Sequence, residues 1–337
     1  MPLTLYVDGP RWRAHLTRTA AANPGLIPVA KGNGYGLTVG RLARRAEWLG
    51  ADLIAVGTYA EVAQVSQRFS GDILVLEPWR PFLPDLAFGP RLLHTVGRAS
   101  DLAALGSRPD TPRVVLEGLS SLRRHGFDPA DLVAADGERG VHIEAHALHL
   151  PLGTGHLEEV ERWVAAAPAR HWFVSHLEPG ELATARIRHP ESDFRPRIGT
   201  QLWLGDTEAL AARATVLDVH AVARGDRVGY RQRRMSKPGR VLVVSGGTAH
   251  GVALEAPTPA ASSRQRAIAV ARGGLDASGR ALSPFVVDGK RRWFVEPPHM
   301  QVSLVFVPAD AATPEPGDEL EVRVRHTTTT FDRVVTS

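Results

Sequence analysis

Residues 26–56 read LIPVAKGNGYGLTVGRLARRAEWLGADLIAV and contain the pattern that decides the fold. An apolar run, Leu26–Ala30, predicts a buried strand, and the glycine-rich turn after it leads into an amphipathic helix over Val39–Leu49. A second apolar run, Leu53–Val56, predicts the next strand. Two strands separated by a helix of this length indicate a parallel β-α-β unit.

The same alternation of strand and helix continues to about residue 205. Further strands are predicted at Ile73–Leu76, Val114–Leu116 and Val141–Ala147, and helices at Tyr59–Arg68, Ser100–Leu105, Pro129–Ala134 and Leu157–Ala167. A barrel of eight β-α units typically needs about 200 to 250 residues. We therefore predict an α/β protein with a (β/α)8 TIM-like barrel over residues 1–205. The pattern alone leaves a doubly wound open sheet as an alternative.

The texture of the sequence changes after Gly205. Short valine-rich runs follow, separated by Gly, Pro and Asp, and most of them have no helical pattern between them. The predicted strands are Ala214–Ala223, Arg240–Val244, Ala267–Ala271, Trp293–Val295, Val302–Val307 and Leu320–Val324. This pattern predicts a mostly antiparallel β domain over residues 206–337.

Composition excludes several classes of protein. The 337 residues are 43% hydrophobic and 23% charged, as in folded globular proteins, and they include no cysteine, so disulfides and thiol chemistry are excluded. No apolar run approaches the roughly 20 residues of a membrane span. Residues 1–8 lack the basic and apolar pattern of a signal peptide. We therefore expect a cytoplasmic protein with no membrane partner.

Positive charge comes almost entirely from arginine, and the formal net charge is +4. The arginines alternate with acidic residues along most of the chain, and the densest run, Arg227–Arg240, has the character of a solvated loop. We therefore expect no nucleic-acid partner. Lysine, by contrast, occurs only at Lys31, Lys237 and Lys290.

Lys31 is the lysine whose position suggests chemistry. It closes the first predicted strand, and the C-terminal ends of barrel strands face the active site. Partial desolvation there would lower the pKa of the amine and favour the neutral form that attacks carbonyl groups. The alternative is a lysine that covers a strand end with its alkyl chain and keeps its charge in water.

His142, His146 and His149 form the other cluster that invites a functional interpretation. Their spacings of four and three do not put all three on one face of a strand, so we predict no metal site there.

The segment VAKGNGYG at Val29–Gly36 resembles the VKANAYG segment of the alanine racemase family. Segments in the same order along the chain are also similar to that family: LRRHGF (122–127), EAHALHL (144–150), RIGTQLW (197–203), GDRVGY (225–230) and GDE (317–319). The resemblance implies a fold-type III enzyme that binds pyridoxal 5′-phosphate and acts on a free amino acid. It also implies a homodimer, in which the β domain of one subunit completes the site of the other.

The resemblance assigns roles to individual residues. Lys31 would form the Schiff base with the cofactor and serve as one catalytic base. Cofactor contacts would come from Tyr35, His149, Ser175, Arg197, Gly199 and Thr200, with Tyr35 on the phosphate and Ser175 the weaker candidate for it. Arg124 and Met300 would bind substrate, Arg124 through the carboxylate.

Arg197 bears on the type of reaction. The resemblance places it against the pyridine nitrogen of the cofactor, where many other enzymes of this class place an acid. Arginine stays protonated in proteins, so it does not transfer its proton to that nitrogen. The ring is then a weaker electron sink, which favours racemisation over decarboxylation or transamination.

The sequence also departs from the family. Thr248 stands where the family has its second catalytic base, a tyrosine, and Gln301 stands where it has an aspartate. His250, two residues after Thr248, could replace the missing base if its loop presents it, although a histidine in a surface loop or turn is the simpler interpretation. Glu117 lies at or near the position where some relatives of that family carry a negatively charged carbamylated lysine close to Arg124. A strand-end glutamate in water is an equally simple interpretation.

These departures predict weak or altered racemase activity and leave two alternatives open. One is another reaction at the α-carbon, elimination or aldol cleavage, which needs proton transfer on fewer faces. The other is a non-catalytic pyridoxal-phosphate-binding homologue. The sequence does not identify the substrate side chain.

Overall fold

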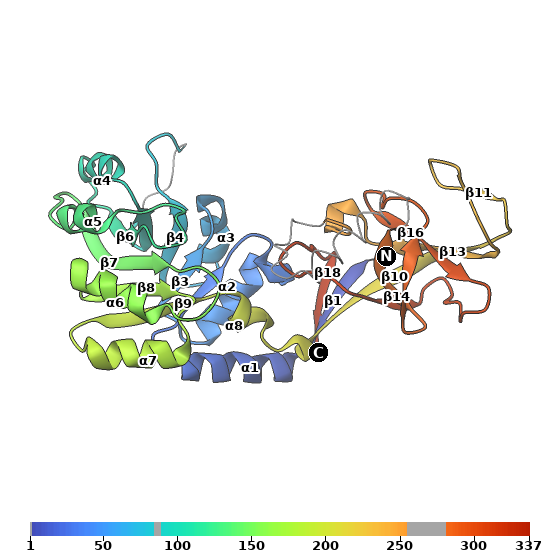
Figure 1. Ribbon diagram of the computed structural model, residues 1–337, viewed down its shortest axis with the longest axis horizontal. Helices are drawn as coiled ribbons and strands as arrows, with labels where there is room; N and C mark the ends of the chain where they lie inside the picture. Colours follow the sequence, from blue (N-terminus) through green and yellow to red (C-terminus); the bar gives the residue numbers. More distant parts are fainter. Residues whose placement is uncertain (1, 84–88, 255–280) are drawn as a thin grey trace. The chain divides into compact units, whose positions relative to one another are not determined.

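The computed structural model describes residues 2–83, 89–254 and 281–337. It divides into two compact units (Figure 1). One unit comprises residues 13–205, and the other comprises residues 1–12 together with residues 206–337.

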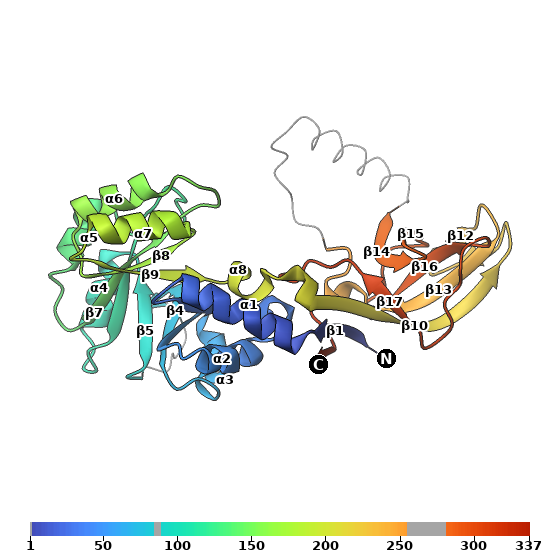
Figure 2. The ribbon, with the colours of Figure 1, turned by 90° about the horizontal axis from the view of Figure 1, so that it is seen from below.

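The unit of residues 13–205 is a closed barrel of eight parallel strands in sequence order, seen in Figures 1 and 2. The ring closes where the first barrel strand pairs with the last, with Ile27 opposite Arg197. This confirms the predicted (β/α)8 TIM-like barrel and excludes the open sheet. The strands are β2 (Ile27–Ala30), β3 (Leu53–Val56), β4 (Asp72–Pro78), β5 (Leu92–Val96), β6 (Arg113–Gly118), β7 (His142–His149), β8 (His171–Ser175) and β9 (Asp193–Ile198).

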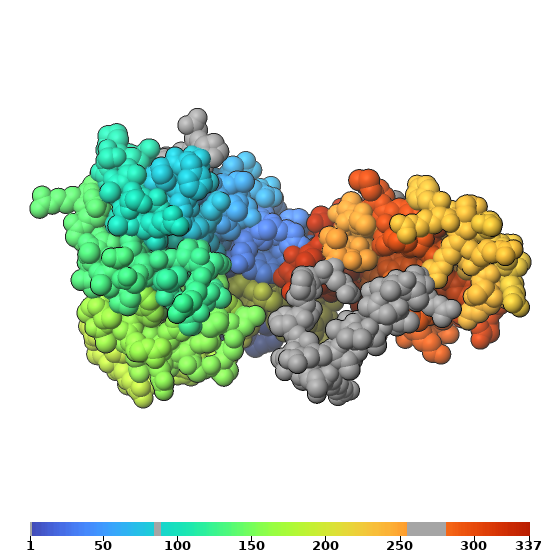
Figure 3. Space-filling model, turned by 45° about the horizontal axis from the view of Figure 1, so that its top comes forward, coloured from blue at the N-terminus to red at the C-terminus, as the bar shows by residue number. Residues whose placement is uncertain are grey.

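Helices follow most of the strands and cover the outside of the ring. Arg41 and Arg44 of α2 are exposed, whereas Leu42, Ala43 and Ala46 are buried, which matches the amphipathic pattern of the sequence. Successive β-α units wrap around the barrel, so the surface colours follow the sequence in Figure 3. The helical segments are α1 (Gly9–Ala22), η1 (Gly34–Gly36), α2 (Val39–Trp48), η2 (Tyr59–Glu61), α3 (Val62–Ser66), α4 (Ala99–Gly106), α5 (Pro129–Ala135), α6 (Leu157–Ala166), α7 (Pro179–Arg188) and α8 (Thr200–Leu204).

Alternate strand residues fill two separate layers. One cluster takes every second residue, such as Ile27 and Val29 of β2 or Leu53 and Ala55 of β3. A second cluster includes both strand and helix residues, among them Trp172 and Trp163. Because both faces of a parallel barrel strand are buried, the strands appear in the sequence as short continuous apolar runs.

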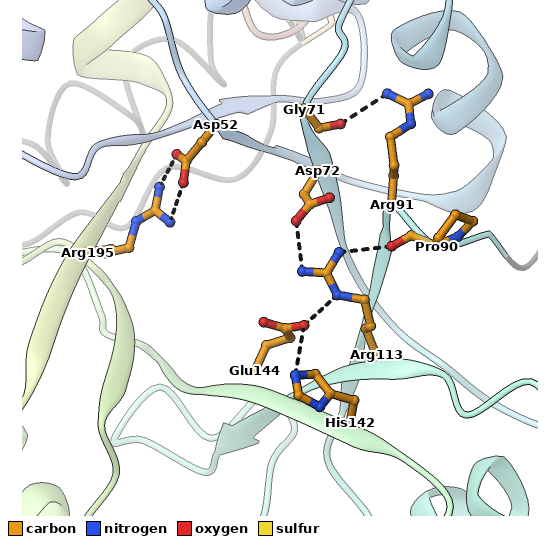
Figure 4. Close-up of polar contacts among 9 residues, drawn as sticks. All are labelled: Asp52, Gly71, Asp72, Pro90, Arg91, Arg113, His142, Glu144 and Arg195. Carbon is orange, nitrogen blue, oxygen red and sulfur yellow. Dashed lines mark hydrogen bonds and ion pairs between the residues drawn. The ribbon is translucent and has the colours of Figure 1, made fainter.

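Charged side chains close the N-terminal end of the barrel (Figure 4). Arg113, at the start of β6, lies 2.8 Å from Asp72 at the start of β4 and also contacts Glu144 of β7. Arg195 of β9 contacts both carboxylate oxygens of Asp52, which precedes β3. Ion pairs therefore link the strand beginnings.

The second unit is built on an eight-stranded sheet in the order β13-β16-β15-β14-β17-β10-β1-β18, with an additional β13–β10 pairing. All pairings except the parallel β1–β18 pair are antiparallel, which confirms the predicted mostly antiparallel β domain. Its elements are β1 (Leu3–Val7), η3 (Thr207–Ala209), β10 (Leu210–Val222), β13 (Gly239–Ser245), η4 (Thr248–His250), β14 (Leu282–Val287), β15 (Lys290–Phe294), β16 (Val302–Pro308), β17 (Glu319–Val322) and β18 (Arg333–Thr336), with a small ribbon of β11 (Arg227–Val228) and β12 (Arg233–Arg234).

The division between the units differs from the predicted one at the N-terminus. Residues 1–12, which we expected in the barrel, belong to the β unit, because Leu3–Val7 pairs with β10 on one side and β18 on the other. The boundary after Gly205 lies where the sequence changes texture. The strand predicted at Ala267–Ala271 lies outside the described residues. Across the described ranges, every helix is too short or too polar to cross a bilayer.

Candidate active site

Most of the predicted site residues gather at the C-terminal end of the barrel. Lys31 directly follows β2, Glu117 lies near the end of β6, His149 ends β7, Ser175 ends β8, and Arg197 lies near the end of β9. Strands of a parallel barrel end on the same side, so five separate segments bring these side chains to the C-terminal end of the barrel, which we call the barrel mouth.

The Lys31 amine lies in an electropositive surrounding. Lys31 is exposed as a whole, but partial desolvation of its amine lowers the pKa of Lys31. The cations of Arg124 and Arg197 lower this pKa further, and the carboxylate of Glu61 raises it. Within the described ranges, Lys31 and Arg124 form no ion pair with an acidic residue. A larger fraction of the amine is therefore neutral, as nucleophilic attack on a carbonyl requires.

Tyr35 occupies a strained position in the turn after Lys31. Its φ of 56° is left-handed, and its side chain is buried. Burial raises the pKa of Tyr35 to about 12. The charge of Glu61 also raises this pKa, and a hydrogen bond to Thr200 lowers it. A side chain at Gly199 would collide with the Tyr35 hydroxyl. The glycine therefore permits a protonated hydroxyl to lie against the start of α8.

Arg197 and Glu117 form a buried ion pair inside the mouth. Nη1 of Arg197 lies 3.2 Å from Oε2 of Glu117, and the side chains are only 2% and 3% exposed. The resemblance suggested that Glu117 supplies negative charge near Arg124; the ion pair that it forms is with Arg197, and its burial rules out a glutamate in water. Nε and Nη2 of Arg197 are buried without a hydrogen-bond partner among the described residues. Buried donors are usually satisfied, so these two N–H groups are available to donate to an acceptor on a ligand.

His149 is accompanied by a second histidine that the sequence analysis missed. The rings of His149 and His176 lie edge to face, with centroids 5.6 Å apart. Burial lowers the pKa of His149 to about 3, with Arg197 and Arg124 adding, and burial also lowers the pKa of His176. Both rings are therefore neutral near pH 7. The position of His176, directly after the end of β8, was the signal that could have found it.

Ser175 points its hydroxyl into the barrel wall. The Oγ donates a hydrogen bond of 3.4 Å to the carbonyl oxygen of Leu148 on the neighbouring strand. The three histidines of β7 are dispersed: His142 pairs with Glu144, His146 hydrogen-bonds Asp136, and His149 lies at the mouth. The described parts of the chain contain no group of three or more side chains arranged to hold a metal ion.

The remaining predicted residues belong to the β unit. His250 is 6% exposed; its Nδ1 accepts a hydrogen bond of 3.2 Å from the Gly247 N–H, and its Nε2 lies 3.1 Å from the Asp332 carboxylate. The accepting Nδ1 must be unprotonated, so Nε2 carries the proton and donates to Asp332. Both ring nitrogens are thus engaged. Met300 is 70% exposed and free to contact another molecule.

Comparison with known proteins agrees with this arrangement. Residues 11–159 match the family described as alanine racemase, N-terminal domain. Alanine racemase from Bartonella henselae, solved with covalently bound pyridoxal phosphate, is 17% identical with a TM-score of 0.72, covering 97% of this chain and 91% of that one. The biosynthetic alanine racemase of Pseudomonas aeruginosa is 22% identical with a TM-score of 0.66, covering 96% and 91%.

The alanine racemase of E. faecalis, 17% identical, aligns with a TM-score of 0.70 over 100% of this chain and 98% of that one. A comparison with curated proteins found no match. Residues 11–159 thus match the alanine racemase N-terminal domain, and the chain has the fold of the alanine racemases with which it aligns.

Proposed function

We propose that this protein is a pyridoxal-phosphate-dependent amino-acid racemase of the alanine racemase type, acting at the α-carbon of a free amino acid, with Lys31 as its cofactor lysine. One observation carries the proposal. Arg197 is buried at the same barrel end as Lys31, with Nε and Nη2 lacking a partner among the described residues.

The groups at the barrel mouth fit this cofactor. The lowered pKa of Lys31 suits a covalent bond between its amine and an aldehyde carbon. The protonated hydroxyl of Tyr35, beside Gly199 and Thr200, would donate to the phosphate. Ser175 is a weaker phosphate ligand, because its hydroxyl already donates to a backbone carbonyl. His149 would lie beside the cofactor as a neutral ring.

Pyridoxal phosphate, when bound, withdraws electrons from the α-carbon of the amino acid attached to it. Arg197 would donate an N–H to the ring nitrogen and keep its proton, which holds electron withdrawal at a moderate level. That suits brief removal and return of the α-proton. Lys31 Nζ would carry the proton on one face, and Arg124 would bind the substrate carboxylate.

On the opposite face of the α-carbon, no side chain of the described ranges is an evident proton carrier. Thr248 has too weak an acid group for this exchange near neutral pH. His250 could act only after Nδ1 releases the Gly247 N–H. This engagement of both His250 nitrogens favours a second candidate function, elimination or aldol cleavage at the α-carbon, for which one face suffices. A pyridoxal-phosphate-binding protein without turnover is the third.

Isotope exchange at the α-carbon tests these functions. The holoenzyme is given L- and D-alanine separately in deuterium oxide. We expect deuterium from the solvent to enter the α-position of one enantiomer, and the other enantiomer to be turned over about 10² to 10⁴ times more slowly. This factor is the usual contribution of one acid–base group. Thr248→Tyr should narrow the gap. Equal exchange from both enantiomers, unchanged in His250→Ala, would place the second base elsewhere, with Tyr230 the next candidate. Bound cofactor with no exchange would indicate the non-catalytic homologue.

We also propose that the protein is a homodimer in which Met300 and the segment around Thr248 approach the partner's Lys31. The exposed Met300 side chain supports this assembly. Sedimentation velocity at micromolar concentration should give the dimer mass. A monomer that retains the cofactor and its stability would contradict the proposal.

A further inference from the structure

Glu61 makes a contact that its own helix does not explain. It is the last residue of η2, and its Oε2 accepts N–H groups from Gly57 at 2.6 Å and Thr58 at 3.2 Å. These two bonds cap the start of the helical segment. Its Oε1, however, accepts the Gly32 N–H at 2.6 Å from a residue 29 positions away. One carboxylate thus joins the turn after β2 to the end of β3.

The joined segments approach each other closely around Lys31. A Cβ placed on Gly57 would lie 2.9 Å from the Lys31 Cβ and 3.2 Å from Glu61 Oε2. Contacts below 3.0 Å are not tolerated between such atoms, so the stem of Lys31 and the carboxylate share the space that glycine leaves free. Gly32 itself has a left-handed φ of 61°. The backbone on both sides of the Lys31 side chain is therefore fixed by one acceptor.

Glu61 also supplies charge to the residues of the turn. Partial burial of the amine lowers the pKa of Lys31. The cations of Arg124 and Arg197 lower this pKa further, whereas the carboxylate of Glu61 raises it. Burial raises the pKa of Tyr35, and Glu61 adds to it. The charged and titratable groups that face the Lys31 amine are Arg124, Arg197, Glu61, His149 and His176.

We propose that Glu61 is the positioning residue of this site, whose carboxylate fixes the 31–36 turn against β3 and acts as the counter-charge of Lys31. The inference rests on the proposed role of Lys31. Glu61 acts through the lysine and through the Tyr35 turn, and it takes no part in proton transfer.

The test measures the reactivity of Lys31 directly. The full-length protein, freed of cofactor with hydroxylamine, is labelled with acetic anhydride across a pH series, and peptide mass spectrometry gives a rate for each of Lys31, Lys237 and Lys290. In Glu61→Gln we expect the Lys31 labelling midpoint to move to lower pH, because the group that raises the pKa of Lys31 is removed. The midpoints of Lys237 and Lys290 should stay where they are.

Pyridoxal phosphate binding provides the second readout. Glu61→Gln should weaken it about tenfold, equivalent to about 1.4 kcal/mol, because charge-assisted bonds to the turn are lost. Glu61→Asp keeps the charge but is one methylene shorter, so it should weaken binding while leaving the labelling midpoint close to that of the parent.

Glu47→Gln is the matched control. Glu47 also accepts a backbone N–H, that of Ser70 at 2.9 Å, together with the Ser70 hydroxyl, on the same unit. It should change neither readout. The proposal is overturned if Glu61→Gln leaves the Lys31 midpoint unchanged, or if Glu47→Gln shifts it equally. If Glu61→Gln folds poorly, Glu61→Asp decides through its cofactor affinity. Failure of the proposed function appears separately, as covalent cofactor retained by Lys31→Ala.

Discussion

The two ends of the barrel carry similar charged side chains but differ in how completely these side chains form ion pairs. At the N-terminal end, Arg113 contacts Asp72 and Arg195 contacts Asp52, so each cation has its counter-charge (Figure 4). At the C-terminal end, Lys31, Arg124 and Arg197 gather with the acids Glu61 and Glu117, and among the described residues only Arg197 of these three cations forms an ion pair. Both ends are built from residues at strand termini, so strand geometry alone does not cause this difference.

The imbalance at the C-terminal end has measurable consequences. Lys31 and Arg124 have no ion pair among the described residues, and Arg197 pairs with Glu117 through one nitrogen only. Burial and these cations together lower the pKa of His149 to about 3. A site that gathers positive charge and keeps its histidine neutral is prepared for an anionic ligand, whereas the other end stabilises the ring.

The largest effect is expected when Lys31 is replaced at the C-terminal end of the barrel. Lys31→Ala should abolish covalent attachment of pyridoxal phosphate, because no other lysine ends a barrel strand. The measurement is the visible absorbance of the bound cofactor, followed by borohydride reduction and mass spectrometry of the protein. Lys237→Ala and Lys290→Ala are the matched controls. Loss of attachment in either control, with retention in Lys31→Ala, would reassign the cofactor lysine.

The second effect concerns Glu117, the acid that pairs with Arg197. Glu117→Gln leaves a buried guanidinium without its counter-charge, and breaking a buried pair in this way typically costs about 3–5 kcal/mol. Denaturant unfolding followed by tryptophan fluorescence measures this free energy. Glu144→Gln at the opposite end is the control, since Arg113 keeps Asp72. An equal loss in both variants would show that the two ends do not differ.

The strand pattern of the sequence placed only Lys31 at a barrel strand end. The resemblance to the alanine racemase family added His149, Ser175 and Arg197, and the structure has all four residues at or near strand ends. Lys31 could be singled out further because an apolar run precedes it and glycines follow.

Other features depend on contacts between distant residues, which no local pattern carries. Glu61 reaches Gly32 across 29 positions, and nothing in the sequence around residue 61 indicates that partner. The last barrel strand, β9, contains Arg195, Pro196 and Arg197, and it is a strand because β2 and β8 flank it. Residues 3–7 join the β unit because residues at the far end of the chain pair with them.

The third prediction compares how the unfolding free energy depends on pH for histidines at the two ends of the barrel. The folded pKa of His149, about 3, lies below the ordinary value of 6.5, so between those values the unfolded chain binds the proton more tightly. His149 therefore costs stability progressively as the pH falls from about 6.5 toward 3. We expect the unfolding free energy of His149→Gln to fall less steeply than that of the parent over pH 6.5–4.

His142→Gln is the control for this pH dependence, because the His142 side chain is 66% exposed beside Glu144 at the other end. It should follow the slope of the parent. Denaturant titrations at each pH supply the slopes, and equal slopes for His149→Gln and the parent would contradict the neutral, half-buried state assigned to His149.

The smallest effect should come from an ion pair at the N-terminal end. Asp52→Asn removes the bidentate partner of Arg195, but the Asp52 side chain is 73% exposed and Arg195 Nε still donates to the Gly25 carbonyl oxygen at 3.0 Å. Exposed pairs typically contribute about 0–1 kcal/mol, and salt screens them. We expect a loss within that range, smaller in 1 M salt than in 0.1 M, and no change in covalent cofactor binding. A loss as large as that of Glu117→Gln would mean that the Asp52–Arg195 pair contributes strongly to holding β9 near the start of β3, on the other side of β2. The N-terminal end would then hold the barrel together by a few strong contacts instead of by many weak ones.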